Sequence, residues 1–178
     1  MQLIKKITDY DIVGDAPEVL DTISRYGARG VLVDDGCNVA MMYMSKTNLY
    51  KLPGGGVDEN EDSEDAFLRE IQEETGYEAD IIHKLGYIEE HKKRNDFMQL
   101  SYCYIAKAGK RQNMMLSESE KQLGMVVKWM TLNKAIEVMN DSSIICDDYS
   151  DRFMILRDKT ILEKTVNILT RLEVKQKH

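Results

Sequence analysis

A run of three glycines that leads into an acidic helix is the feature that most constrains how this chain folds. The run Leu52-Pro53-Gly54-Gly55-Gly56 precedes a stretch, residues 58–80, that holds eleven acids and a single base. Asp and Ser residues at the start of this stretch can cap a helix, acids in a first turn suit the helix dipole, and Gly76 can end the helix. The pattern therefore predicts a helix over residues 64–74.

The predicted helix has a carboxylate face beside an apolar face. Glu70, Glu73 and Glu74 lie within about 100° of one another on a helical wheel. Their mutual repulsion costs only about a few tenths of a kcal/mol per pair, so a solvated acidic face is one interpretation. The other is a site for Mg²⁺ or Mn²⁺, because hard cations take oxygen ligands and the unhindered glycine backbone can approach an ion or a phosphate.

The charge of the chain is concentrated in this segment. The 178 residues include 24 Lys+Arg and 31 Asp+Glu, which gives a formal net charge of −7. Eleven acids and one base give residues 58–80 a charge of −10, so the remainder carries +3. An acidic chain without a broad basic face argues against a stable nucleic-acid partner and against binding to an anionic membrane.

Composition and cysteine usage predict a globular protein of the cytoplasm. With 43% hydrophobic and 31% charged residues, the chain has material for a core and a charged surface. Its apolar runs are too short for a transmembrane helix, and the charged start is not expected to be a secretory signal. Cys37, Cys103 and Cys146 are far apart, which argues for reduced thiols rather than a disulfide framework or a cysteine zinc site.

Apolar runs along the chain predict a mixed sheet covered by helices. The expected strands are 3–8, 29–33, 39–44, 81–90, 97–106 and 126–130, and the expected helices are 64–74, 132–139 and 149–172. The turn residues Asp34-Asp35-Gly36 predict that the second and third strands form an antiparallel pair. Hairpins combined with helices indicate an α/β fold whose sheet is mixed and partly antiparallel.

The acidic segment resembles the Nudix box. Gly55, Glu61 and the run Arg69-Glu70-Ile71-Gln72-Glu73-Glu74-Thr75-Gly76-Tyr77 match the family pattern G-x5-E-x7-R-E-U-x-E-E-x-G-U, where U is a bulky apolar residue, at every fixed position. Tyr77 stands where an aliphatic residue is commoner. Seven fixed residues would coincide by chance about once in 10⁹ windows. The resemblance extends over residues ~25 to 140. It implies one Nudix hydrolase domain over 1–178, with the first ~24 residues and the helix at ~149–172 as family-variable additions.

The resemblance implies an α/β/α sandwich that hydrolyses a nucleoside diphosphate linked to another moiety, with Mg²⁺ or Mn²⁺ as cofactor. The metal ligands that it implies are Gly54, through its carbonyl, and Glu70, Glu73 and Glu74. Glu70 and Glu73 are the implied catalytic residues, and Glu70 is the first candidate to orient or deprotonate the attacking water. Glu61 and Arg69 would brace the loop against the helix.

Further site residues are candidates outside the box. In some family members a carboxylate from a distant loop serves as ligand or base, and Glu118 and Glu120 are the candidates here, with Glu120 preferred. Arg29 and Lys46 could contact a substrate phosphate, with an ordinary surface charge as the alternative. Residues 91–94 are expected to form a solvated hairpin tip, with a basic loop near the site that would suit a polyphosphate as the alternative.

The substrate implied by default is a nucleoside triphosphate, as in MutT-like enzymes. The chain has only two prolines, so the downstream proline associated with ADP-ribose enzymes is absent. Hydrolysis of a nucleotide sugar or of a dinucleotide such as ADP-ribose is the alternative, and a non-catalytic nucleotide-sensing module is an alternative of another class. A homodimer through the C-terminal helix is also left open.

Overall fold

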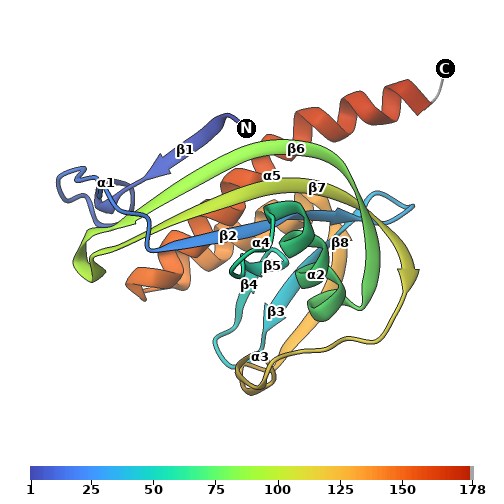
Figure 1. The fold of residues 1–178 in the computed structure, drawn as a ribbon, viewed down its shortest axis with the longest axis horizontal. Helices are drawn as coiled ribbons and strands as arrows, with labels where there is room; N and C mark the ends of the chain where they lie inside the picture. Colours follow the sequence, from blue (N-terminus) through green and yellow to red (C-terminus); the bar gives the residue numbers. More distant parts are fainter. Residues whose placement is uncertain (177–178) are drawn as a thin grey trace.

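The computed structural model describes residues 1–176, with side chains to Arg171 (Figure 1). Its elements in chain order are β1 (Leu3–Ile7), α1 (Asp9–Val13), β2 (Arg25–Val33), β3 (Asn38–Met44), β4 (Leu49–Lys51), β5 (Gly54–Gly56), α2 (Ser63–Thr75), β6 (Tyr77–Lys92), a 3-10 turn (Lys93–Asn95), β7 (Phe97–Arg111), α3 (Glu118–Gln122), β8 (Met125–Thr131), α4 (Leu132–Ile145) and α5 (Tyr149–Gln176). No helix in this part of the chain is both long enough and apolar enough to cross a membrane.

The strands form one mixed sheet. Its main order is β1-β6-β7-β2-β3-β4, with β5 paired to β2 and β8 paired to β3. The pairs β1–β6 and β2–β7 are parallel, whereas β6–β7, β3–β4 and β3–β8 are antiparallel. The mixed, partly antiparallel sheet predicted from the sequence is therefore confirmed.

The junction between β2 and β3 differs from the simple hairpin that the turn residues predict. The two strands are antiparallel, but the register joins only Val33 to Val39. Earlier in β2, residues 27–29 pair instead with the glycine strand β5, so that Arg29 lies opposite Gly54. This close pairing needs glycine, since Gly54 has φ of +140° and a Cβ there would lie 2.6 Å from the Arg29 Cα. The expected glycine loop is thus an added edge strand.

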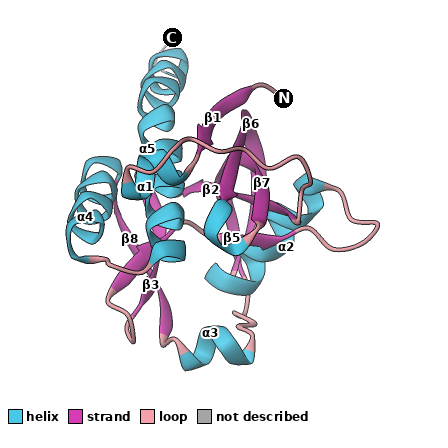
Figure 2. Ribbon diagram, turned by 90° about the vertical axis from the view of Figure 1, so that its left-hand side faces the viewer, coloured by secondary structure: helices cyan, strands magenta, loops and turns pink. Residues whose placement is uncertain are grey.

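Helices cover both faces of the sheet. On one face α2 buries Phe67 and Ile71 against Ala28 and Tyr104 of the sheet. On the other face α4 and α5 pack on a larger core that includes Phe153 of α5. Figure 2 shows α2 on one side of the strands and α4 with α5 on the other. The molecule therefore has three layers, helix, sheet and helix, as expected.

Helix α2 forms almost where the sequence predicts it. Asp62 caps its start by accepting hydrogen bonds from the backbone N–H groups of Glu64 and Asp65, and Gly76 ends it with φ of +75°. The strands at 81–90 and 97–106 are longer than expected, because β6 and β7 pair with each other from Tyr77 to Arg111. The short helices α1 and α3 have no strong periodic pattern in the sequence and were not expected.

Candidate active site

A cleft of about 660 Å³ opens where β5, α2, the loop before α3 and the start of α5 meet. The acidic side chains that line it are Glu70, Glu73, Glu120 and Asp151. The basic side chains that line it are Arg25, Arg29, Lys51, Lys92 and Arg157. The cleft thus presents carboxylates and cations in a single space, which suits a ligand that combines a divalent cation with phosphate groups.

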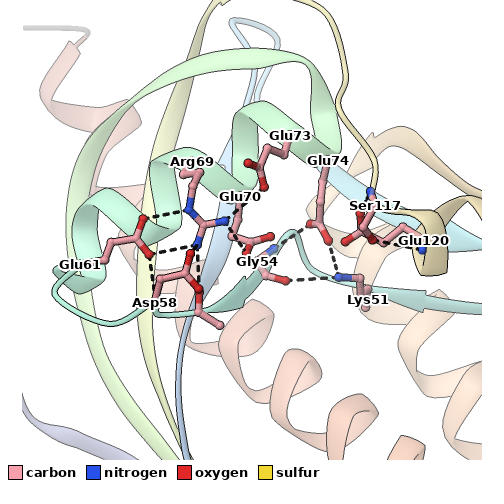
Figure 3. Close-up of polar contacts among 11 residues, drawn as sticks. Lys51, Gly54, Asp58, Glu61, Arg69, Glu70, Glu73, Glu74, Ser117 and Glu120 are labelled. Atoms are coloured by element: carbon pink, nitrogen blue, oxygen red, sulfur yellow. Dashed lines mark hydrogen bonds and ion pairs between the residues drawn. The ribbon is translucent and has the colours of Figure 1, made fainter.

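Arg69 connects the acidic helix to the loop before it (Figure 3). Its Nε and Nη2 donate to the two carboxylate oxygens of Glu61 at 2.8 and 3.0 Å, and Nη2 also donates to the Gly56 carbonyl at 3.1 Å. Its Nη1 donates to Glu70 at 2.9 Å and to Glu73 at 3.2 Å. The bond from Arg69 lowers the pKa of Glu61. The planar guanidinium therefore fixes three carboxylates relative to the end of β5.

Glu74 is buried against the glycine strand. Its side chain is 1% exposed, and its Oε2 accepts the Gly54 N–H at 2.8 Å. The Lys51 Nζ donates to Glu74 Oε1 at 2.5 Å and to the Gly54 carbonyl at 3.3 Å. Burial raises the pKa of Glu74, and the Lys51 ammonium opposes that increase. Two of the oxygens that the family resemblance implies as metal ligands, Glu74 Oε1 and the Gly54 carbonyl, are thus bonded to a cation of the chain itself.

Three carboxylates converge although one of them comes from a distant segment. Oxygens of Glu70, Glu74 and Glu120 all lie within 4.8 Å of one another. Glu120 belongs to α3, where its Oε2 accepts the Ser117 N–H at 2.8 Å. Glu73 lines the same cleft but is turned toward Arg69 (Figure 3). This set of oxygen donors fits Mg²⁺ or Mn²⁺, which bind carboxylates and phosphates.

Of the site candidates that lie outside the Nudix-box residues, some line the cleft and others do not. Arg29 lines the cleft and is 5% exposed. Lys46 is exposed in the turn that joins β3 to β4, and it is not among the residues that line the cleft. Because β4 leads from that turn toward β5, the cation beside the glycines is Lys51 rather than Lys46. Glu118 is 82% exposed and pairs with Lys121, so of the two α3 candidates only Glu120 joins the cluster.

Of the basic residues that line the cleft, sequence reasoning missed Arg25, Lys51 and Arg157 and gave Lys92 a different place. The position of Lys51 directly before Leu52-Pro53 and the glycines could have identified it as a site residue. Lys92 was expected at a solvated hairpin tip, but its side chain is only 13% exposed. His91 beside it is buried and accepts the Leu20 N–H at 2.9 Å, whereas Lys93 and Arg94 are exposed, so the expectation is correct only for the second half of the segment. Arg157 comes from α5, and no pattern in the sequence indicates that this helix reaches the site.

Comparison with known proteins identifies the family. Residues 25–146 match the family model described as the NUDIX domain. Because this match covers more than half of the chain, the chain belongs to the Nudix family. Helix α5, which supplies one wall of the cleft, lies beyond the matched residues.

Individual relatives are more distant. A putative 8-oxo-dGTP diphosphatase of Bacillus subtilis (strain 168) is 34% identical over 70 residues, which are 39% of this chain and 47% of that protein. Nudix hydrolase 7 of Arabidopsis thaliana is 27% identical over 99 residues, 53% of this chain and 33% of that protein. The chain therefore spans less than half the length of these two relatives.

Solved structures support the fold. A NUDIX hydrolase from Nitrosomonas europaea aligns with a TM-score of 0.56 and 14% identity, over 75% of this chain and 88% of that one. A MutT NUDIX hydrolase from Burkholderia pseudomallei aligns with a TM-score of 0.50 and 22% identity, over 61% of this chain and 84% of that one. At these identities the similarity concerns the fold alone.

Proposed function

We propose that this chain is a metal-dependent pyrophosphohydrolase that cleaves a nucleoside diphosphate linked to another moiety, with a nucleoside triphosphate as its substrate. The convergence of Glu70, Glu74 and Glu120 oxygens within 4.8 Å, beside a cleft that Glu70, Glu120 and the glycine strand line, carries this proposal. The name of the Bacillus subtilis relative, a putative diphosphatase of a nucleoside triphosphate, also supports it. Hydrolysis of a nucleotide sugar or of ADP-ribose is the alternative within the same class.

Mg²⁺ or Mn²⁺ is the proposed cofactor. Glu70, Glu74 and Glu120 would hold it, with the Gly54 carbonyl as a further ligand and Glu73 available from the same cleft. When bound, such an ion neutralises the charge that develops on phosphate oxygens and lowers the pKa of a nearby water. Lys51 bonds to two of these oxygens, so its ammonium must yield some of its contacts when the ion binds.

The proposed roles of the box residues follow from their contacts. Arg69 holds one oxygen of Glu70 at 2.9 Å, which leaves the other oxygen to orient the attacking water and accept its proton. Glu73 is the second proposed catalytic residue, because it lines the cleft and is held by the same guanidinium. Glu61 fixes Arg69 through two bonds and so positions both carboxylates without contacting the substrate.

Residues outside the family match are proposed to belong to the same unit. Phe153 and Leu162 of α5 are fully buried in the core shared with the sheet, and Asp158 of α5 accepts the Leu52 N–H at 2.8 Å. We infer one domain over residues 1–178. The cytoplasmic location and the homodimer expected from the sequence stay predictions.

Hydrolysis of a nucleotide panel tests the proposal. The purified chain is incubated with Mg²⁺ and separately with Mn²⁺ on nucleoside triphosphates, including 8-oxo-dGTP, and on ADP-ribose and a UDP-sugar. Released phosphate, pyrophosphate and nucleoside monophosphate are then measured. We expect turnover of a triphosphate and a loss of about 100-fold or more in Glu70→Gln, Glu74→Gln and Glu120→Gln.

A matched control variant shows whether a loss of activity comes from the metal site or only from the removal of a negative charge. Glu118→Gln removes one carboxylate from the same short helix as Glu120 but from an exposed position that pairs with Lys121. It should keep wild-type activity. Turnover of no compound in the panel, together with tight nucleotide binding that survives in Glu70→Gln, would show a nucleotide-sensing module rather than an enzyme.

A further inference from the structure

Arg29 is a buried cation that forms no ion pair or side-chain hydrogen bond with the residues that the structure describes. It lies on β2, is 5% exposed and lines the cleft. Among the residues that the structure describes, its Nε is buried without a hydrogen-bond partner. None of the ion pairs or side-chain hydrogen bonds within residues 1–171 involves its guanidinium. A buried charge without a partner costs about several kcal/mol, so Arg29 requires an explanation.

The charges behind Arg29 do not supply a partner. Arg157 uses its Nη1 for Glu90 at 3.1 Å and its Nε for Asp158 at 2.7 Å. Lys92 approaches the other oxygen of Glu90 at 3.7 Å. The two buried carboxylates, Glu90 and Asp158, therefore pair with Lys92 and Arg157. When Arg29 is included, this buried cluster carries three cations and two carboxylates, a surplus of one positive charge. Burial and then the nearby Arg157 lower the pKa of Arg29, and Asp158 and Glu90 offset this only in part.

One further carboxylate lines this part of the cleft. Asp151 lies on α5 at the same opening, but it forms no ion pair within the described part of the chain. Its pKa is raised, mainly by burial and then by Asp148. Asp151 therefore does not neutralise Arg29, and the Arg29 guanidinium stays available to a ligand in the cleft.

The position of Arg29 places this surplus charge next to the proposed metal site. Arg29 is the register partner of Gly54, whose N–H and carbonyl contact Glu74 and Lys51. The carboxylates of Glu70 and Glu120 line the same cleft. An elongated ligand can therefore place metal-bound phosphates at the carboxylates and a further anionic group at Arg29.

We propose that Arg29, supported by Lys92 and Arg157, binds a terminal phosphate of the substrate, and that it selects nucleoside triphosphates over nucleoside diphosphates whose outer phosphate is blocked by a sugar. A terminal phosphate carries close to two negative charges and offers oxygens that match the fork of a guanidinium. ADP-ribose and nucleotide sugars have no such group. The choice of substrate rests on the proposed function, whereas anion binding at Arg29 does not.

Metal-free binding of inorganic tripolyphosphate tests the anion site directly. Calorimetry in EDTA at low ionic strength compares the wild type with Arg29→Met, which has a similar length and no charge. We expect binding by the wild type and a loss of about tenfold or more in Arg29→Met, since a hydrogen bond to a charged group is lost. Arg29→Lys, which keeps the charge without the fork, should bind between these two. Lys110→Met, a control at an exposed position of β7, should bind like the wild type.

A second arm uses the substrate preference. With Mg²⁺, Arg29→Met should lower kcat/KM for the nucleoside triphosphate by about tenfold and leave kcat/KM for ADP-ribose unchanged. Arg29→Met should also be at least as stable as the wild type, because no paired carboxylate is left behind.

Three results would overturn the proposal. They are absence of tripolyphosphate binding by the wild type, equal binding by Arg29→Met, or a loss of stability in Arg29→Met as large as that in Arg157→Met, which would show a structural role. Failure of the chain to hydrolyse any nucleotide would instead contradict the proposed function, and the metal-free arm would still decide the anion site.

Discussion

Alanine at Gly55 should displace the carboxylate of Glu70 without disturbing the fold. A Cβ at position 55 would lie 2.7 Å from Oε2 of Glu70 and closer still to Oε1 and Cδ, whereas ordinary contacts with a Cβ begin near 3.4 Å. The backbone of Gly55 does not lie in the left-handed region, so alanine is free to adopt it. The three nearest atoms all belong to the end of the Glu70 side chain, so this group has to move.

The size of the effect follows from this displacement. The carboxylate must shift by about 1 Å, and a misplacement of about 1 Å in a reacting group can cost about 100-fold in rate. That factor corresponds to about 2.7 kcal/mol of lost transition-state stabilisation. Stability should change by less than about 1 kcal/mol, since the Glu70 side chain is flexible at its end and Gly→Ala also restricts the unfolded chain.

Gly56→Ala provides the matched control at the next position. The three atoms nearest to a Cβ there all belong to the flexible end of Arg25, with Nη2 at 2.9 Å, so this variant displaces a cation of the cleft rather than a carboxylate. The assay compares kcat/KM with Mg²⁺, the affinity for Mn²⁺ and the urea midpoint of both variants. Equal activity of Gly55→Ala and Gly56→Ala would refute the idea that Gly55 is needed to seat the Glu70 carboxylate.

Three further predictions concern buried charges and thiols. Arg157→Met should lower the free energy of unfolding by about 3–5 kcal/mol in urea melts, because it leaves Asp158 buried without its cation and Glu90 with only the more distant Lys92; an unchanged midpoint would contradict this. Burial raises the pKa of Cys103 to about 12, so above its ordinary value of 9.0 the unfolded chain releases a proton that the folded chain keeps, and stability falls as pH rises. Cys103→Ala should remove about 1.4 kcal/mol per pH unit of this slope between about pH 9 and pH 11, and parallel slopes would argue against it. Lys51→Met should bind Mn²⁺ several-fold more tightly in a spectroscopic titration, since the ammonium no longer holds Glu74 and the Gly54 carbonyl; weaker binding would show that Lys51 assists the ion instead.

The acidic helix could be predicted closely because its determinants are local. Caps at Asp62 and Gly76 set its ends, and the structure has it at Ser63–Thr75 against an expected 64–74. The spacing of Glu70, Glu73 and Glu74 places them on one face of any helix. The mixed sheet was also predictable, since each apolar run indicates its own strand. The pairing of residues 27–29 of β2 with β5 instead of β3 was not predictable, because strand register depends on partners elsewhere in the chain.

The second half of the cleft was decided by tertiary structure. Glu120 joins Glu70 and Glu74 while Glu118, two residues earlier, faces solvent. Arg29 and Lys46 look alike in sequence, yet one is buried beside Gly54 and the other lies in an exposed turn.

The sequence by itself determined the family, the acidic helix and the glycine run that leads into it, because these depend on residues within a few turns of one another. Only the tertiary structure decided which cations face that helix, since Lys51, Lys92 and Arg157 meet there from β4, β6 and α5. No spacing along the chain encodes such a meeting. It follows from the packing of α5 on the sheet, where apolar burial rather than charge brings the segments together.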